Sequence, residues 1–151
     1  MTNAYLSSII KIRYTNDYQK ERRLLMGEIH LSDAEWEIMN CLWNKPNQKI
    51  SEIVIALSEK KAWDKHTVIT LLNRLEKKGA VAFERNGRAK EYYPLISQKE
   101  TVKQETEQFF KRVCQGSLRL MVNSFLSSKA VKKEDLDELY RMLDEAREGN
   151  E

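Results

Sequence analysis

The most informative chemistry in the sequence lies in residues 64–77, where polar side chains occupy one side of a helical repeat. Val68, Leu71, Leu72 and Leu75 follow the i, i+3, i+4, i+7 spacing of one apolar helix face. The other side presents residues that mostly donate or accept hydrogen bonds: Lys65, His66, Thr67, Ile69, Thr70, Asn73, Arg74 and Lys77. Arginine can pair with guanine, threonine can contact base edges, and an apolar side chain can contact a thymine methyl group. This face is suited to reading a DNA groove, but any amphipathic helix has a polar face, so the helix alone leaves both interpretations open.

A second group of cations surrounds an Asn-Gly pair. Arg85 and Arg88 flank Asn86-Gly87, and Lys90 follows two residues later. Asn-Gly between β-prone runs indicates a hairpin, because both turn positions need positive φ. A cationic hairpin tip suits a phosphate backbone or a minor groove, although charged edges also discourage aggregation. Helix and hairpin together favour DNA binding, with Lys65, His66, Thr67, Ile69, Thr70, Asn73, Arg74, Arg85, Arg88 and Lys90 as the expected contacts.

The distribution of charge agrees with this interpretation. The whole chain carries a net charge of only +3. Residues 60–90 hold nine Lys or Arg and three Asp or Glu, whereas residues 98–151 hold ten and eleven. A basic middle joined to a near-neutral end is typical of a polyanion-binding module attached to a second functional part.

Other kinds of chemistry find little support. Cys41, Cys114, His30 and His66 lack metal-ligand spacing, and neither histidine has a recognisable nucleophile beside it. No Gly-rich phosphate loop is present, so neither an enzyme nor a cofactor is expected. The absence of a disulfide framework favours a reducing cytoplasm. The longest apolar run, residues 53–57, is too short to cross a bilayer, so no membrane insertion is expected.

Local signals predict the elements that position these groups. Ser32 and Glu35 form a capping box for a first helix, Ser51 is the expected cap of a second, and Asp64 that of a third. The helices are expected at about 33–44, 52–60 and 65–78, and the hairpin strands at 81–85 and 88–95. Three helices followed by a hairpin predict a winged helix-turn-helix in a mainly α fold.

The remainder of the chain is expected to be helical and apolar on one side. Ser97 with Glu100 should open a helix to about residue 115, followed by a segment at 118–126 and a last helix at 133–148. We expect an N-terminal extension at 1–25, a DNA-binding winged helix at 26–96 and a helical dimerisation domain at 97–151. The expected homodimer contacts are apolar: Phe110, Leu118, Met121, Val122, Phe125, Leu126, Leu136, Leu139, Tyr140 and Leu143.

The sequence also resembles a known family. Residues 31–43, beginning Leu-Ser-Asp-Ala-Glu-Trp, are similar to the opening helix of the penicillinase repressor family, the BlaI/MecI/CopY-type winged-helix regulators. Residues 67–79 resemble its recognition helix, and residues 92–95 resemble the end of its wing. The resemblance implies a cytoplasmic homodimeric repressor that binds a palindromic operator upstream of resistance genes. By position, Thr67, Thr70 and Arg74 match residues that face DNA, whereas His66 and Ile69 depart from some members.

In the penicillinase branch of that family, cleavage within the first C-terminal helix ends repression, and a membrane sensor protease triggers it. The bond between Gln108 and Phe109 occupies the corresponding place, with Gln instead of Asn. The copper-responsive branch of the family instead carries a cysteine-rich metal motif near its C-terminus. No cysteine follows Cys114 in this sequence, which argues against direct copper sensing. A metal- or thiol-responsive repressor and a winged-helix protein-interaction module remain as alternatives, and the inducer, the regulated genes and the operator sequence stay open.

Overall fold

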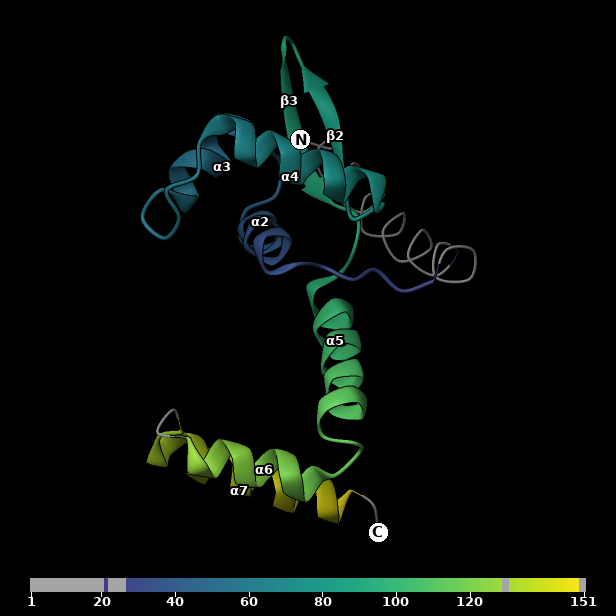
Figure 1. The fold of residues 1–151 in the computed structure, drawn as a ribbon, viewed down its shortest axis with the longest axis vertical. Helices are drawn as coiled ribbons and strands as arrows, with labels where there is room; N and C mark the ends of the chain where they lie inside the picture. The colour runs from purple at the N-terminus through teal and green to yellow at the C-terminus, as the bar shows by residue number, and fades with distance from the viewer. Residues whose placement is uncertain (1–20, 22–26, 129–130, 150–151) are drawn as a thin grey trace. The chain divides into compact units, whose positions relative to one another are not determined.

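The computed structural model describes residues 21, 27–128 and 131–149. The predicted extension at 1–25 lies outside the described residues apart from Glu21. The elements are α2 (Asp33–Asn44), β1 (Gln48–Lys49), α3 (Ile50–Leu57), α4 (Lys65–Lys77), β2 (Val81–Asn86), β3 (Ala89–Pro94), α5 (Gln98–Val113), α6 (Leu118–Ser127) and α7 (Lys133–Glu148) (Figure 1). Three helices and a hairpin form a winged helix, which confirms the predicted fold class.

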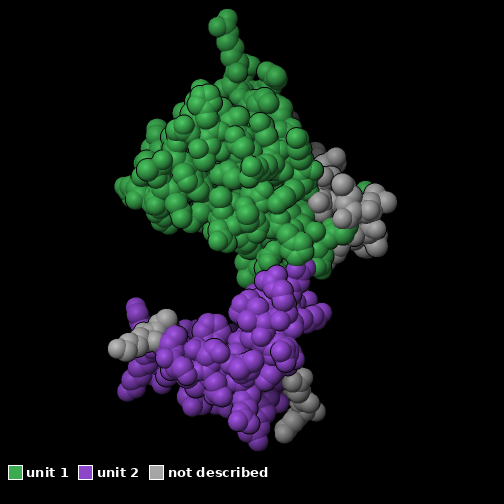
Figure 2. Space-filling model, viewed as in Figure 1, with its two compact units in different colours: residues 1–105 green, residues 106–151 purple. Residues whose placement is uncertain are grey.

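The chain divides into two compact units, residues 1–105 and residues 106–151 (Figure 2). The first contains the winged helix and the beginning of α5. The second contains the end of α5 with α6 and α7. The predicted domain boundary at residues 96–97 stays a prediction. No described helix is both long enough and apolar enough to span a membrane.

Of the caps predicted for the first three helices, two are present and one is wrong. Ser32 and Glu35 form the expected capping box of α2, and the Asp64 carboxylate accepts from Thr67 N at 2.8 Å at the start of α4. For α3, however, the N-cap is Lys49 and not Ser51, because the Glu52 carboxylate closes the first turn by accepting from Lys49 N at 2.8 Å. The helix therefore begins at Ile50 and ends at Leu57, three residues before the expected end.

The core of the winged unit lies between α2, α3, α4 and the hairpin. Its completely covered side chains come from all of these elements: Ile38, Met39, Leu42, Ile53, Val68, Leu72, Leu75 and Val81. The four residues predicted for the apolar face of α4 are all buried. Because that face is held in the core, the opposite face of α4 points away from it.

The sheet has three antiparallel strands in the order β1-β3-β2. Strand β1 has only two residues and was not predicted. Asn86 pairs with Ala89, so Gly87 and Arg88 form the turn, and the predicted Asn86-Gly87 turn is wrong by one residue. Gly87 has φ +63° while Arg88 has no positive φ. This pattern is typical of a type II′ turn, which requires glycine only at its first central position.

The second unit follows the predicted order with one shorter helix. Helix α5 ends at Val113 instead of about residue 115, because Gln115 and Gly116 adopt φ values of +51° and +73°. Ser117 then caps α6 by accepting from Leu120 N at 3.2 Å. Helix α7 spans the predicted residues 133–148.

Candidate nucleic-acid interface

The polar face of α4 is open to solvent along its length. Its predicted contacts Lys65, His66, Thr70, Asn73 and Arg74 are exposed, and Thr67 and Ile69 are half-buried. This exposure follows from the apolar repeat of α4, because burial of the apolar face fixes how the helix is rotated about its axis. A continuous row of side chains is therefore presented on one side of the winged unit.

The start of α4 carries a carboxylate at the point where a helix usually attracts anions. The backbone hydrogen bond from Thr67, together with its hydroxyl, lowers the pKa of Asp64 below its ordinary value of 3.8. Because Asp64 already occupies these donors, phosphate is not expected at this helix end. The face must therefore act through its side chains.

One threonine of this face has an internal partner for its hydroxyl proton. Thr70 Oγ1 donates to His66 O at 2.9 Å. With this bond in place, the Thr70 hydroxyl can only accept from a base, and the major-groove donors are adenine N6 and cytosine N4. Among the described residues, Asn73 and Arg74 have no intramolecular side-chain hydrogen bond. The donors of these two side chains are therefore not used by other described residues.

The end of α4 is anchored to the start of α2. Lys78, the C-cap of α4, donates from Nζ to Glu35 Oε2 at 2.6 Å and to His30 O at 2.7 Å. Burial works to raise the pKa of Glu35, but hydrogen bonds from Lys78 and Ser32 outweigh it and lower that pKa. The ion pair thus ties the orientation of α4 to the capping box of α2.

The hairpin carries the second set of predicted contacts. Arg85 and Arg88 are exposed and Lys90 is half-buried. Arg85 lies directly opposite Lys90 in the register, and Arg88 occupies the turn. The tip of the hairpin projects beyond the helices of the winged unit (Figure 1). The three cations are therefore presented at or near a protruding tip.

Two residues that position the site were not singled out from the sequence. Lys78 was assigned only to the end of a helix, and nothing local reveals its ion pair with Glu35, 43 residues away. Phe83 lies beneath the Lys90 ammonium, which is 3.8 Å from the ring centroid. The alternation of side chains along a strand could have placed Phe83 and Lys90 on the same face of the hairpin. That inference needs the register of the two strands, which the sequence alone does not fix.

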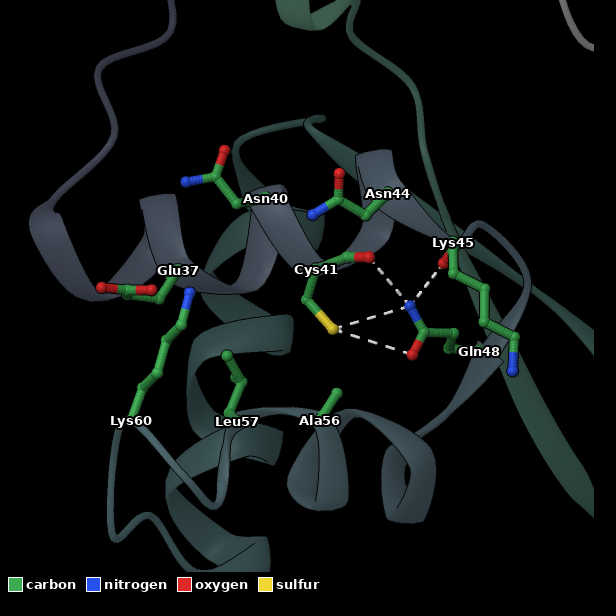
Figure 3. Close-up of a pocket in the computed structure, with 9 residues that line it drawn as sticks. All are labelled: Glu37, Asn40, Cys41, Asn44, Lys45, Gln48, Ala56, Leu57 and Lys60. Carbon is green, nitrogen blue, oxygen red and sulfur yellow. Dashed lines mark hydrogen bonds between the residues drawn. The ribbon is translucent and has the colours of Figure 1, made fainter.

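A small cavity of about 220 Å³ lies between α2 and α3 (Figure 3). The half-buried Cys41 thiol donates to Gln48 Oε1 at 3.7 Å, and Gln48 Nε2 donates back to Cys41 O at 2.9 Å. Burial raises the pKa of Cys41, which reduces its reactive thiolate. The described residues contain no group of three His, Cys, Asp or Glu side chains able to hold a metal ion. This cavity therefore offers neither an activated nucleophile nor a metal centre.

The residues predicted for cleavage and dimerisation lie on α5, α6 and α7. Gln108 and Phe110 are half-buried and Phe109 is exposed, all within the continuous helix α5. On α6 and α7, Met121, Val122 and Leu136 are half-buried, and the other predicted contacts are exposed: Leu118, Phe125, Leu126, Leu139, Tyr140 and Leu143.

Comparison with known proteins places this geometry in a family. Residues 31–145 match the family model described as penicillinase repressor. The penicillinase repressor of Bacillus licheniformis is 34% identical over 115 residues, covering 76% of this chain and 90% of that protein. The methicillin resistance regulatory protein MecI of Staphylococcus aureus (strain N315) is 27% identical over 113 residues, covering 75% and 92%. Among solved structures, the DNA-binding domain of the repressor BlaI is 35% identical, covers 47% of this chain and 87% of its own, and gives a TM-score of 0.43. These relatives are named as repressors or regulators and not as enzymes, and the chain belongs to the penicillinase repressor family.

Proposed function

We propose that the protein is a sequence-specific transcriptional repressor that binds double-stranded operator DNA. The observation that carries the proposal is the exposure, on one winged unit, of both the polar face of α4 and the cations of the hairpin. Membership of the penicillinase repressor family supports it. The relative from Bacillus licheniformis is itself named a penicillinase repressor.

In this proposal α4 is the recognition helix and lies in the major groove. Arg74 pairs with guanine and Asn73 with adenine, as their donor patterns allow. Thr70 accepts from adenine or cytosine because its own proton is used within the helix, and the Thr67 hydroxyl contacts a neighbouring base edge. Lys65 and His66 lie in the exposed first turn, from which recognition helices commonly reach base edges. The hairpin cations contact the backbone, which sets orientation without reading sequence.

The acting species is a homodimer assembled through α6 and α7. An apolar groove of about 460 Å³ lies between these helices, lined by exposed side chains that include Leu118, Phe125, Leu139 and Leu143. Apolar surface of this kind usually marks an interface. A second copy of the chain is the occupant, because a two-fold dimer presents two recognition helices to a palindromic operator.

Repression ends when α5 is cut between Gln108 and Phe109 in the cytoplasm, by a route that starts at a membrane sensor protease. Cutting there separates the winged unit from the dimer helices. Each half-site is then bound by a single winged unit, and about 10²–10⁴ in operator affinity is lost with the linkage. The continuous helix protects this bond until the segment opens locally.

The test of DNA binding uses the full chain and a labelled duplex from its own promoter region. A repressor that neutralises several phosphates loses about 10³–10⁵ in affinity between about 50 and about 200 mM salt. A scrambled duplex of equal length should bind more weakly at every salt concentration. Little affinity for either duplex at low salt would refute the proposal and favour a protein-interaction module.

The test of cleavage follows the intact chain by mass spectrometry while source cells are exposed to a β-lactam. A new N-terminus at Phe109 is the expected product. A Phe109→Asp variant should still repress but resist induction. An intact wild-type chain during full induction would refute cleavage while leaving the repressor assignment standing.

A further inference from the structure

The segment just before α2 is held by the core of the winged unit. Ile29 and Leu31 are buried among the core residues, whereas the His30 side chain between them is exposed. The carbonyl of His30 accepts from Lys78 Nζ, at the end of α4, at 2.7 Å. Residues 29–31, which we call the strap, are therefore anchored by two buried side chains and by a hydrogen bond from α4.

The strap contacts two consecutive residues of α5. Gln104 Nε2 donates to Ile29 O at 3.3 Å, and Glu105 Oε1 lies 3.5 Å from His30 Nδ1. Glu105 Oε1 is covered from solvent and accepts no hydrogen bond within the described part of the chain. Covered polar atoms need a partner, and the imidazole is the group placed to supply one. The pairing needs a hydrogen on Nδ1, which the imidazolium or one neutral tautomer carries.

The two contacted residues support the helical turn that follows them. In an α-helix the N–H of residue i donates to the carbonyl of residue i−4. In the continuous helix α5, the N–H of Gln108 therefore reaches back to Gln104. The N–H of Phe109 reaches back to Glu105 in the same way. Opening the chain at residues 108–109 breaks these hydrogen bonds, and the strap holds the residues that accept them.

We propose that the strap restrains the opening of α5 at the Gln108–Phe109 bond and so sets how fast this bond can be cut. The closed helix is stabilised by one hydrogen bond and one ion pair to the strap, and the open helix has neither. Ile29 and His30 precede the residues 31–145 that match the family model, so the restraint comes from outside the matched region. Its role in ending repression rests on the proposed cleavage, whereas the restraint itself does not.

The experiment measures this opening in the purified full chain, by amide hydrogen exchange and by digestion with thermolysin, which cuts before large apolar residues. Both rates follow the population of the open form when closing is fast. His30→Ala and Glu105→Ala should each raise exchange and cutting at residues 108–109 by about two- to fivefold, the range of a partly exposed ion pair. In the Glu105→Ala background, His30→Ala should have no further effect, because the two side chains act on each other.

Glu107→Ala is the matched control. Glu107 is exposed on the same helix, and its replacement changes helix propensity in the same way as Glu105→Ala. It should raise neither rate. Equal rates in the two glutamate variants, or a further effect of His30→Ala without Glu105, would overturn the inference. The amide of Ile38 in the core helix α2 reports global unfolding, and an equal rise there would also overturn it.

A second variant covers the case in which His30→Ala does not fold. Gln104→Ala removes the other contact with the strap and should give an increase of the same size. The measurement uses neither DNA nor inducer, so unchanged rates in Gln104→Ala and Glu105→Ala refute the restraint and leave the proposed repressor standing. An intact chain in fully induced cells refutes the proposed cleavage alone.

Discussion

Replacing Lys78 with methionine tests how the recognition helix is anchored. Methionine keeps an unbranched apolar stem but removes the ammonium group that donates to Glu35 Oε2 at 2.6 Å and to His30 O at 2.7 Å. The Glu35 side chain is only 2% exposed. Its carboxylate would keep the hydrogen bond from Ser32 N at 2.8 Å and lose its cation.

The size of the effect follows from the exposure of the pair. Breaking a fully buried ion pair costs about 3–5 kcal/mol, and a hydrogen bond to a charged group contributes about 1.5–3 kcal/mol. The Lys78 side chain is 39% exposed, so water can approach the carboxylate where the ammonium has been removed. We therefore expect the free energy of unfolding to fall by the smaller amount, about 1.5–3 kcal/mol at neutral pH.

The loss in free energy of unfolding caused by Lys78→Met should also depend on pH. Burial raises the pKa of Glu35, but the hydrogen bonds from Lys78 and Ser32 bring it below its ordinary value of 4.5. A carboxyl group with a lowered folded-state pKa stabilises the fold above its unfolded-state pKa. That contribution is lost as pH falls through the folded-state value. The Lys78→Met penalty should be complete at neutral pH and shrink below pH 4.5.

Urea unfolding at neutral and acidic pH measures both expectations. Lys77→Met is the matched control, because Lys77 is the neighbouring exposed lysine of the same helix. A Lys78→Met penalty no larger than that of Lys77→Met would refute the anchoring argument. A penalty that stays constant down to acidic pH would show that Glu35 does not carry it.

The remaining expectations concern recognition, assembly and the helix cap. Arg74→Ala should weaken promoter binding by about 1–3 kcal/mol and relax specificity at one base pair, as titration of single-base variants would show. Thr70→Val removes only an acceptor toward DNA, since its proton bonds to His66 O; we expect a loss of about 0.5–1.5 kcal/mol, and equal binding to every base variant would contradict it. Leu143→Glu should give monomers in light scattering and reduce operator affinity by about 10²–10⁴; a persistent dimer would exclude this face. The Asp64 carboxylate stabilises the fold at higher pH, and this contribution is lost as pH falls through its lowered pKa, below 3.8. Asp64→Asn should therefore make the free energy of unfolding less sensitive to acid in that range. An unchanged pH profile would count against the cap.

The elements that sequence reasoning located well are those with local signals. Helices α2, α4 and α7 begin and end within a residue or two of their expected positions, because capping groups and apolar repeats act over a single turn. Ser51 was predicted as the N-cap of α3 because serine is a common residue at that position. In the structure the Glu52 carboxylate instead accepts from the backbone N–H of Lys49 and closes the first turn there. Residue type alone does not decide between these two arrangements.

Features that depend on contacts between residues far apart in the sequence were not predicted, for a different reason. Strand β1 exists only because Gln48 and Lys49 pair with Tyr92 and Glu91, more than 40 residues later. The solvent-exposed residues of α4 were predictable from the apolar repeat. The Phe83 contact with Lys90 depends on the hairpin register, and a shift of one residue would exchange the two faces of the hairpin.

The carboxamide of Gln48 has a consequence for how the winged unit moves. It is buried, and its Nε2 donates to Cys41 O at 2.9 Å and to Lys45 O, while its backbone pairs with Tyr92. The last carbonyls of α2 are therefore completed by a residue whose own place depends on β3. Amide protons in the last turn of α2 and around Tyr92 should exchange with solvent in one cooperative opening and not by separate fraying. We expect a junction of this kind to open as one unit and not to bend by small steps, so the packing of α2 against β3 should keep one shape when the winged unit binds.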